Sequence, residues 1–294
     1  MLGLPRLLVT SLASSRYASR GGAPGQEFSS FGRSLGLKAL LRGERAGLRM
    51  ILAPVSITRY WEFPFVRRHL SPNPGRCLDI SSPRLFSYYV ASRMRPNSVR
   101  MLNPDRVDAA VTERIARRCG IDLQVEVAPV SAMNPDTERF NSIWSISVIE
   151  HIGEDGDIDA MRRMYGALAP GGRLLVTVPV DRNSWDEYRP TDTYALGAPR
   201  GPDGWFFQRW YDQAAIASRL LDPIDAGGAQ LEWFGEREPG RFSTYIDAWL
   251  QGGWRTTVED PREITDWYAP YRTWREMPGQ GVCGIAITKP ETMS

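Results

Sequence analysis

Short apolar runs alternate with amphipathic stretches through the middle of this chain of 294 residues. The runs have the length and composition of buried strands, and the stretches between them carry apolar residues at helical spacing. Strands that alternate with helices of about 10 to 15 residues form a parallel sheet with right-handed crossovers and helices on both faces. The pattern therefore predicts an α/β, doubly wound domain whose first five strands are adjacent and parallel. These strands are expected near residues 77–80, 99–102, 123–127, 142–147 and 173–178.

The chain ahead of this alternation divides into two expected segments. Residues 1–26 contain arginines and serines but no acidic residue. Pro5 and Arg6 interrupt their apolar patch too early for a secretory signal, so a poorly ordered leader is favoured over a targeting segment. Residues 27–74 carry apolar residues at roughly helical spacing and are expected to form an N-terminal helical arm.

The main domain is expected to span residues 75–290, because the turn-forming cluster SPNPG precedes it at 71–75. About 40 residues, near 239–279, separate the last two expected strands and are rich in aromatic side chains. A stretch of this length is too long for a plain hairpin loop. It predicts an inserted helical or irregular lid.

The overall composition excludes several classes of protein. With 36 basic and 34 acidic residues the net charge is +2, which lacks the basic excess of a nucleic-acid-binding protein. Cys77, Cys119 and Cys283 are scattered, so we expect no disulfide framework, no metal site and a reducing, cytoplasmic location. No window approaches the roughly 18 apolar residues of a membrane span. All but two basic residues are arginine, which is typical of a GC-rich genome and favours a bacterial source; the oligomeric state stays open.

The first strand and its turn, RCLDISSPRLFSYYV (76–90), raise the question of which ligand the sheet binds. In an open α/β sheet the ligand lies outside the carboxyl ends of the strands. A dinucleotide needs glycines in this turn because its pyrophosphate must approach the backbone closely. The turn is instead Ser81-Ser82-Pro83, so a dinucleotide-dependent oxidoreductase is a distant alternative.

The stretch FNSIWSISVIEHIGEDGDIDAMRRMYGALAPGGRLLVTVPV (140–180) resembles the second half of class I S-adenosylmethionine-dependent methyltransferases. In that family a strand with the pattern F-D-x-V-x-S-x-S-V-I-E-H-I is followed by a helix that ends in L-x-P-G-G and by the fifth strand. Asn141 stands where Asp is usual. The matching residues are Ser145, Ser147, Glu150, His151, Leu168, Pro170, Gly171 and Gly172. The resemblance implies a Rossmann-like, seven-stranded sheet that is mostly parallel, with GVCGIAITKP (281–290) as an antiparallel last strand.

The resemblance also implies that S-adenosylmethionine is the cofactor. Asp79 would face its methionyl ammonium group, and Ser81 and Ser82 would replace the glycines of the family's first motif, with Ser147 at the same pocket. Ser82 before Pro83 suits the start of a helix, whose free N–H groups could bind the cofactor's carboxylate. The alternative is that these residues only start a helix in a protein that no longer binds a cofactor.

The next two strand ends should contact the ribose and the adenine. Asn103 and Asp105 follow the second strand, and a carboxylate accepts hydrogen bonds from both ribose hydroxyls better than an amide does. Asp105 could equally cap the following helix. Ser131 and Met133 follow the third strand, where the family often has an acid that contacts the adenine amino group.

His151 is the acid–base candidate, because it follows the fourth strand at the mouth of the expected crevice. A methyl acceptor must lose a proton as it attacks, and a histidine suits this work. Glu150 could orient the imidazole or act in its place. The alternative is that the Glu-His pair serves only the geometry of the loop.

Eight of the ten tryptophans lie after residue 180, where related enzymes recognise their acceptors. Aromatic side chains interspersed with Asp and Arg suit a sugar or an amphipathic acceptor, although they can also serve only to pack the insertion. We expect methyl transfer to an oxygen or nitrogen of a small-molecule or glycan-type acceptor. The alternative is a catalytically silent methyltransferase-like protein that acts as a binding or scaffold module.

Overall fold

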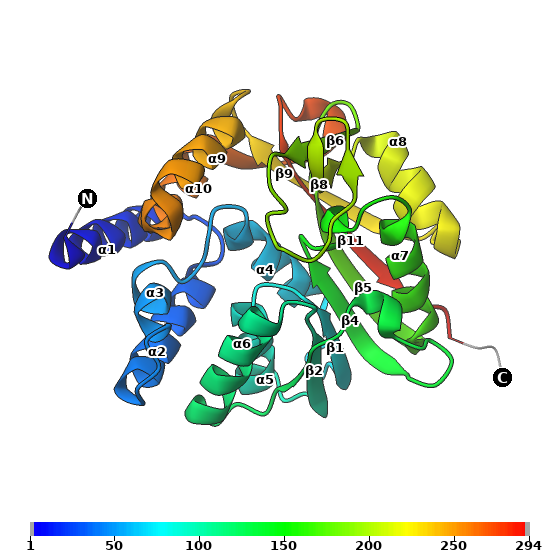
Figure 1. Ribbon diagram of the computed structural model, residues 1–294, viewed down its shortest axis with the longest axis horizontal. Helices are drawn as coiled ribbons and strands as arrows, with labels where there is room; N and C mark the ends of the chain where they lie inside the picture. The colour runs from blue at the N-terminus through cyan, green and yellow to red at the C-terminus, as the bar shows by residue number, and fades with distance from the viewer. Residues whose placement is uncertain (1–2, 292–294) are drawn as a thin grey trace.

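A central sheet of eight strands organises the structure, a computed structural model that describes residues 3–291 (Figure 1). Its strand order is β10-β9-β11-β5-β4-β1-β2-β3. The strands are β1 (Arg76–Ile80), β2 (Ser98–Leu102), β3 (Gln124–Glu126), β4 (Phe140–Ile146), β5 (Leu168–Val180), β9 (Gln230–Glu236), β10 (Tyr268–Tyr271) and β11 (Gly281–Thr288). The first five pair in parallel, which confirms the prediction from the strand–helix alternation. As expected, the last strand, β11, runs antiparallel to both of its neighbours, β5 and β9.

The number of strands in this sheet corrects the sequence analysis, which expected seven. The extra strand, β10, comes from the insertion between β9 and β11 and pairs antiparallel with β9. Its sequence, YAPY, contains a proline, which is tolerated at an edge because one side of an edge strand donates no ladder hydrogen bonds.

Helices cover both faces of the sheet (Figure 1). They are α1 (Leu4–Arg20), α2 (Gln26–Leu41), α3 (Gly47–Leu52), α4 (Arg59–His69), α5 (Leu85–Arg93), α6 (Arg106–Cys119), α7 (Gly156–Gly166), α8 (Gln213–Ala215), α9 (Arg241–Gly252) and α10 (Asp260–Trp267). Adjacent strand residues such as Ile143 and Trp144 belong to two different buried clusters, because successive side chains of a strand point to opposite faces. One cluster contains residues of α2, α4, α5 and α6, and the other contains residues of α7 and of the segment after α8.

The arm helix α4 lies directly on the sheet, where it contacts β4, β5 and β11. The ring of Trp61 stacks between those of Phe65 and Phe234, with centroids 5.3 and 5.4 Å away. Gly284 of β11 allows this close approach, since a Cβ there would lie 2.7 Å from the Phe65 ring. The arm is thus part of the core of the domain.

The N-terminal segment differs from the expected leader. Over the described residues it is the helix α1, which contacts α10 and η5, a 3₁₀ segment of the insertion. Its buried face consists of Leu7, Ser11, Ser14 and Ala18. These positions follow helical spacing, but two of them are serines, so the pattern of apolar residues alone did not reveal a packed face.

Two insertions complete the fold. The expected lid contains α9, η5 (Gly253–Val258), α10 and β10. A second insertion, which the sequence analysis did not anticipate as a sheet, follows β5 and forms three antiparallel strands, β6 (Trp185–Arg189), β7 (Arg200–Gly201) and β8 (Gly204–Trp210).

Among the described residues no helix is long and apolar enough to cross a membrane.

Candidate functional site

The turn after β1 folds back on itself and buries Asp79 completely. The Ser82 N–H donates to Asp79 Oδ1 over 3.0 Å, and the Ser87 hydroxyl donates to Oδ2. The carboxylate therefore does not face an open crevice, in contrast to the expectation that it would meet the cofactor's ammonium group. Burial raises the pKa of Asp79 to about 6, although the hydrogen bonds from Ser87 and Ser82 oppose that shift.

Ser82 also differs from its expected role as a helix cap. Helix α5 begins three residues later, at Leu85, and no side chain caps it. The Ser82 hydroxyl instead accepts the Ile146 N–H at 2.9 Å, while its own N–H is directed back to Asp79. The turn is thereby joined to the end of β4, directly before Ser147.

The buried carboxyl of Asp79 gives a pH dependence that can be measured. Its pKa rises from the ordinary value of 3.8 to about 6 in the folded protein. Its contribution to stability is therefore fully present below pH 3.8 and is lost as the pH rises through about 6, by up to ~3 kcal/mol. The Asp79→Asn variant cannot ionise, so it should gain stability relative to the wild type between pH 4 and pH 7 in urea denaturation. A difference between the two proteins that does not change with pH would contradict this prediction.

Ser81 adopts a left-handed backbone conformation with φ of 51°, which is where glycine is usual. Its N–H and its hydroxyl both lie 2.8 Å from the Leu102 carbonyl oxygen, to which they donate. These bonds join the turn after β1 to the end of β2. The two hydrogen bonds stabilise the left-handed conformation of Ser81. They also occupy its N–H and hydroxyl, which are then not free to bind a ligand.

The two ribose candidates occupy different environments. Asn103 is buried, accepts the Asp105 N–H at its Oδ1 and donates from Nδ2 to Asp108, which also pairs with Arg84. Asp105 caps α6, since its Oδ1 accepts the N–H groups of Val107 and Asp108. The structure therefore shows Asp105 in the capping role. Asp105 Oδ2 forms no hydrogen bond to the described residues.

The adenine candidates lie in the loop after β3. Ser131 is exposed in the 3₁₀ turn η1 (Val130–Ala132). The side chain of Met133 is buried in the cluster that contains Ile80 and Leu102, and its carbonyl accepts a hydrogen bond from Arg163. Neither side chain forms a hydrogen bond with the other predicted site residues in the described part of the chain.

A buried acid that the sequence analysis missed lies at the ends of β4 and β5. Glu62 of α4 is fully buried and accepts hydrogen bonds from the hydroxyls of Ser147 and Thr177. Its other oxygen, Oε2, pairs with Arg59 at 2.6 Å, and Arg59 also donates to Ser147 at 3.1 Å. An acid in the otherwise aromatic run RYWEFPF was the one signal in the sequence for this cluster.

Glu150 and His151 lie beside that cluster. Burial raises the pKa of Glu150 to about 8, against the opposing effect of the nearby Arg59 charge, and Glu150 Oε2 has no hydrogen-bond partner in the described residues. His151 Nδ1 lies 2.7 Å from the Phe207 carbonyl oxygen, which only accepts, so the proton is assigned to Nδ1. Burial lowers the pKa of His151 to about 4. The imidazole is therefore neutral, and its Nε2 lone pair lies 3.4 Å from the Tyr194 hydroxyl.

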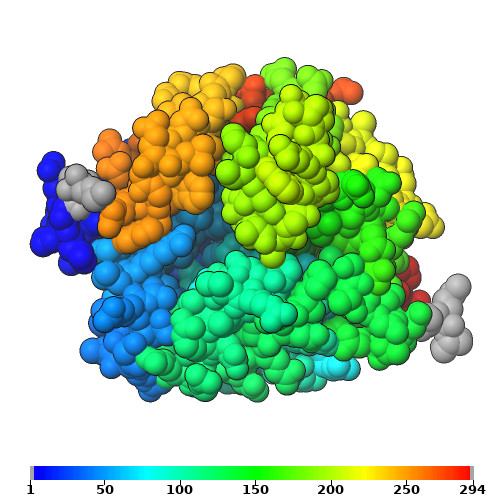
Figure 2. All heavy atoms as spheres, in the orientation of Figure 1, coloured from blue at the N-terminus to red at the C-terminus, as the bar shows by residue number. Residues whose placement is uncertain are grey.

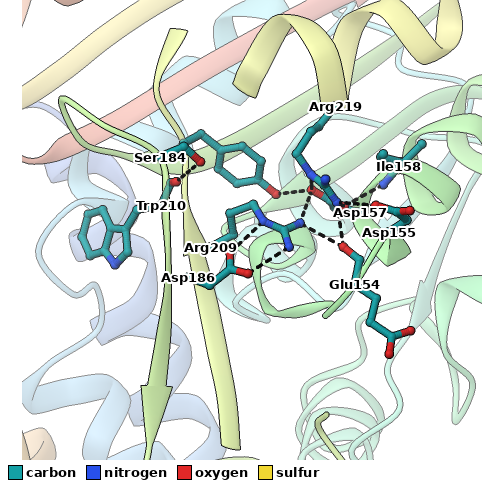
Figure 3. Close-up of polar contacts among 10 residues, drawn as sticks. Glu154, Asp155, Asp157, Ile158, Ser184, Asp186, Arg209, Trp210 and Arg219 are labelled. Atoms are coloured by element: carbon teal, nitrogen blue, oxygen red, sulfur yellow. Dashed lines mark hydrogen bonds and ion pairs between the residues drawn. The ribbon is translucent and has the colours of Figure 1, made fainter. Parts of the chain in front are cut away.

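Ion pairs hold the second insertion against this site (Figure 3). Arg209 of β8 lies between Asp186 and Asp157, each at 2.9 Å, and Asp157 belongs to the first turn of α7. Arg219 and the Tyr211 hydroxyl reach the same Asp157 carboxylate. The cluster fixes β8, whose neighbouring Phe207 carbonyl in turn orients His151.

A recess opens between these insertions and the arm (Figure 2). It is bordered by the orange segment of α9 and α10, by the yellow-green β6–β8 insertion and by the green-cyan region around α6. The arm, in blue, is visible at its floor. In the described part of the chain, no group of three or more His, Cys, Asp or Glu residues could hold a metal ion.

Comparisons with known proteins bear on the fold alone. No protein-family model matches the sequence, and no curated protein matches it significantly. The structure is similar to that of coclaurine N-methyltransferase bound to N-methylheliamine and S-adenosylhomocysteine, with a TM-score of 0.50 and 12% identity over 77% of this chain and 68% of that one. For a phosphoethanolamine N-methyltransferase 2 of Haemonchus contortus the TM-score is 0.49 and the identity 15%, over 79% of this chain and 53% of that one. For the [4+2]-cyclase SpnF the TM-score is 0.46 and the identity 18%, over 78% of this chain and 80% of that one. The similarity to coclaurine N-methyltransferase shows that the chain has the fold of the class I S-adenosylmethionine-dependent methyltransferases. In this chain the predicted site residues lie at or after the carboxyl ends of strands β1 to β4.

Proposed function

We propose that the protein binds S-adenosylmethionine at the carboxyl ends of β1, β2 and β4 and transfers its methyl group to an oxygen or nitrogen of a small-molecule or glycan-type acceptor. One observation carries the proposal. On a sheet of the class I methyltransferase fold, a hydrogen bond connects the Ser82 turn to the end of β4. Ser147, to which Arg59 of α4 donates, and the Glu150–His151 pair follow that strand end. Ligands of open α/β sheets bind at this edge.

The residues at this edge fit the cofactor in part. The unpaired Oδ2 of Asp105 would accept hydrogen bonds from the ribose hydroxyls while Oδ1 keeps its capping role. Arg59, whose side chain is 23% exposed, would bind the methionyl carboxylate. Asp79 is unavailable for the ammonium group because its two oxygens already accept hydrogen bonds from Ser82 of the turn and Ser87 of α5.

His151 would act on the acceptor. When bound, S-adenosylmethionine supplies an electrophilic methyl group on a sulfonium sulfur. Nε2 of His151 would accept the proton that the acceptor oxygen or nitrogen loses on methylation. The bond from Nδ1 to the Phe207 carbonyl fixes the tautomer that this step requires. The remaining catalysis comes from holding the two reactants in line.

A catalytically silent relative is the second candidate function. It is favoured by the internal bonding of Asp79 and Asn103, which leaves two family positions without a free acceptor. In such a protein we would expect large side chains to fill the site. Tyr88, however, donates to the Thr112 carbonyl, and the ring of Tyr89 packs on that of Phe28, so both are engaged between helices.

Calorimetry with S-adenosylhomocysteine separates the two candidates, and a His151→Gln variant tests the chemistry. We expect the wild type to bind and His151→Gln to bind within about twofold, because the side chain faces the acceptor. Methyl transfer from labelled cofactor to a panel of hydroxyl and amine acceptors should fall ~10²- to 10⁴-fold in the variant. Absence of binding by the wild type would favour the silent relative, and undiminished transfer by the variant would exclude His151 as the base.

A further inference from the structure

A groove of about 390 Å³ lies between α1 and α2, away from the strand ends. Helix α1 contributes Arg16 and Arg20 together with Ser15 and Ser19, which repeat at the four-residue spacing of one helix face. Helix α2 contributes further serines and Arg33. The groove thus contains three arginines and several hydroxyls, and no acidic residue lines it.

No carboxylate of the described residues neutralises the positive charge of the groove. Arg33 is half-buried and donates only to neutral oxygens, those of Ile51, Ser11 and Ser15. In the described residues no carboxylate lies within ion-pair distance of Arg16, Arg20 or Arg33, and burial lowers the pKa of Arg33. A guanidinium that is partly withdrawn from water without a counter-charge is costly, and an anion from outside the chain would relieve that cost.

Hydrogen-bond donors of α2 reach the same groove. The side-chain Nε2 of Gln26 is shielded from solvent and has no partner in the described part of the chain. Gln26 is the first residue of a 16-residue helix whose cap, Gly25, has no side chain to accept the free N–H groups. Ser29 is buried, and within residues 3–291 its hydroxyl has one long contact, of 3.5 Å, with the Tyr60 hydroxyl. An amide donor, hydroxyls and a helix N-terminus all suit an oxyanion.

We propose that this groove binds a phosphate group, with Arg16, Arg20 and the pre-positioned Arg33 as its cationic ligands. Arginine presents paired N–H donors that match the geometry of phosphate oxygens. The phosphate could belong to a small soluble molecule or to a lipid headgroup. The exposed side chains of Leu4 and Leu8 on α1 are compatible with the second source, because they would lie beside the lipid's apolar part.

The test uses the full-length protein and two probes. Calorimetry with inorganic phosphate and pyrophosphate at constant ionic strength tests the soluble source. Sedimentation with vesicles of phosphatidylcholine, with and without phosphatidic acid, tests the lipid headgroup. We expect Arg16→Gln/Arg20→Gln to weaken binding at least ~10-fold in whichever arm shows it, because two charge-assisted contacts are lost.

Two further variants keep the test decisive. Arg6→Gln/Arg117→Gln removes the same charge from exposed positions outside the groove, and binding should stay within about twofold. Ser30→Glu places a carboxylate at an exposed position of the groove and should abolish binding while the thermal unfolding curve is unchanged. The proposal is overturned if neither probe binds, or if both double variants weaken binding equally.

Discussion

Replacement of Glu62 by alanine is expected to lower the free energy of unfolding by about 3 to 5 kcal/mol, the usual cost of removing one partner from a buried ion pair. Among the described residues, the variant leaves the Arg59 guanidinium with the hydroxyls of Thr58 and Ser147 as its hydrogen-bond partners. It also removes the acceptor for the Ser147 and Thr177 hydroxyls. Urea denaturation followed by tryptophan fluorescence measures the effect, because Trp61 lies in the same helix.

Glu232→Ala is the matched control for this prediction. Glu232 also pairs with an arginine of α4, Arg68, but both side chains are more than a third exposed, so we expect a loss below ~1 kcal/mol. A double variant, Arg59→Met/Glu62→Leu, should recover much of the loss because no unpaired charge remains. If Glu62→Ala and Glu232→Ala lowered the free energy of unfolding equally, the Arg59–Glu62 pair would contribute no more than an exposed ion pair does.

The same variant links stability to the proposed function. Ser147 holds a left-handed backbone conformation, with φ of 47°, directly after β4. Its hydroxyl donates to Glu62 and accepts from Arg59, so α4 determines where this strand end lies. We therefore attribute to the arm a share of the site, and not only of the core.

The sequence predicts the parts of this fold that follow from local patterns, and it does not predict contacts between residues far apart in the chain. Strands β1, β4 and β5 contain largely buried apolar runs, and burial on both faces produces such runs without help from distant residues. The motif around Ser147 and His151 was recognisable because it resembles a family pattern that is contiguous in the sequence. The role of Glu62 was not, because its partners Ser147 and Thr177 are 85 and 115 positions away in the chain.

Polar residues account for the other departures. The packed face of α1 includes Ser11 and Ser14, which bond to backbone carbonyls of other segments and so are buried without appearing apolar. In the β6–β8 insertion, arginines and acids are interspersed among aromatics, and their pairing cannot be read from spacing alone. The prediction that Asp79 faces an open crevice failed because of the conformation of the turn after β1. The Ser82 N–H points back to Asp79, so this carboxylate is buried in the interior.

Asp157→Ala is expected to have a comparable effect on the other side of the site. Asp157 is fully buried and binds Arg209 and Arg219 (Figure 3). It also accepts a hydrogen bond from the Tyr211 hydroxyl. Burial alone would raise the pKa of Asp157, but the hydrogen bonds from Arg219 and Tyr211 and the two positive charges hold it below its ordinary value. Removal of the carboxylate leaves two guanidiniums without this partner, at a cost of about 3 to 5 kcal/mol.

Part of that cost should appear locally, in the β6–β8 insertion. Arg209 lies in β8, so its release should increase amide hydrogen exchange across residues 185–210 before the central sheet exchanges. Asp155→Ala is the control, since Asp155 pairs with the same Arg219 but its side chain is 82% exposed, and the expected loss is below ~1 kcal/mol. If the two variants exchange alike, the insertion is held by its aromatic contacts and not by this cluster. If only Asp157→Ala exchanges faster, the Asp157 carboxylate holds β8 in place. It then also positions the Phe207 carbonyl, which lies 2.7 Å from Nδ1 of the proposed base, His151.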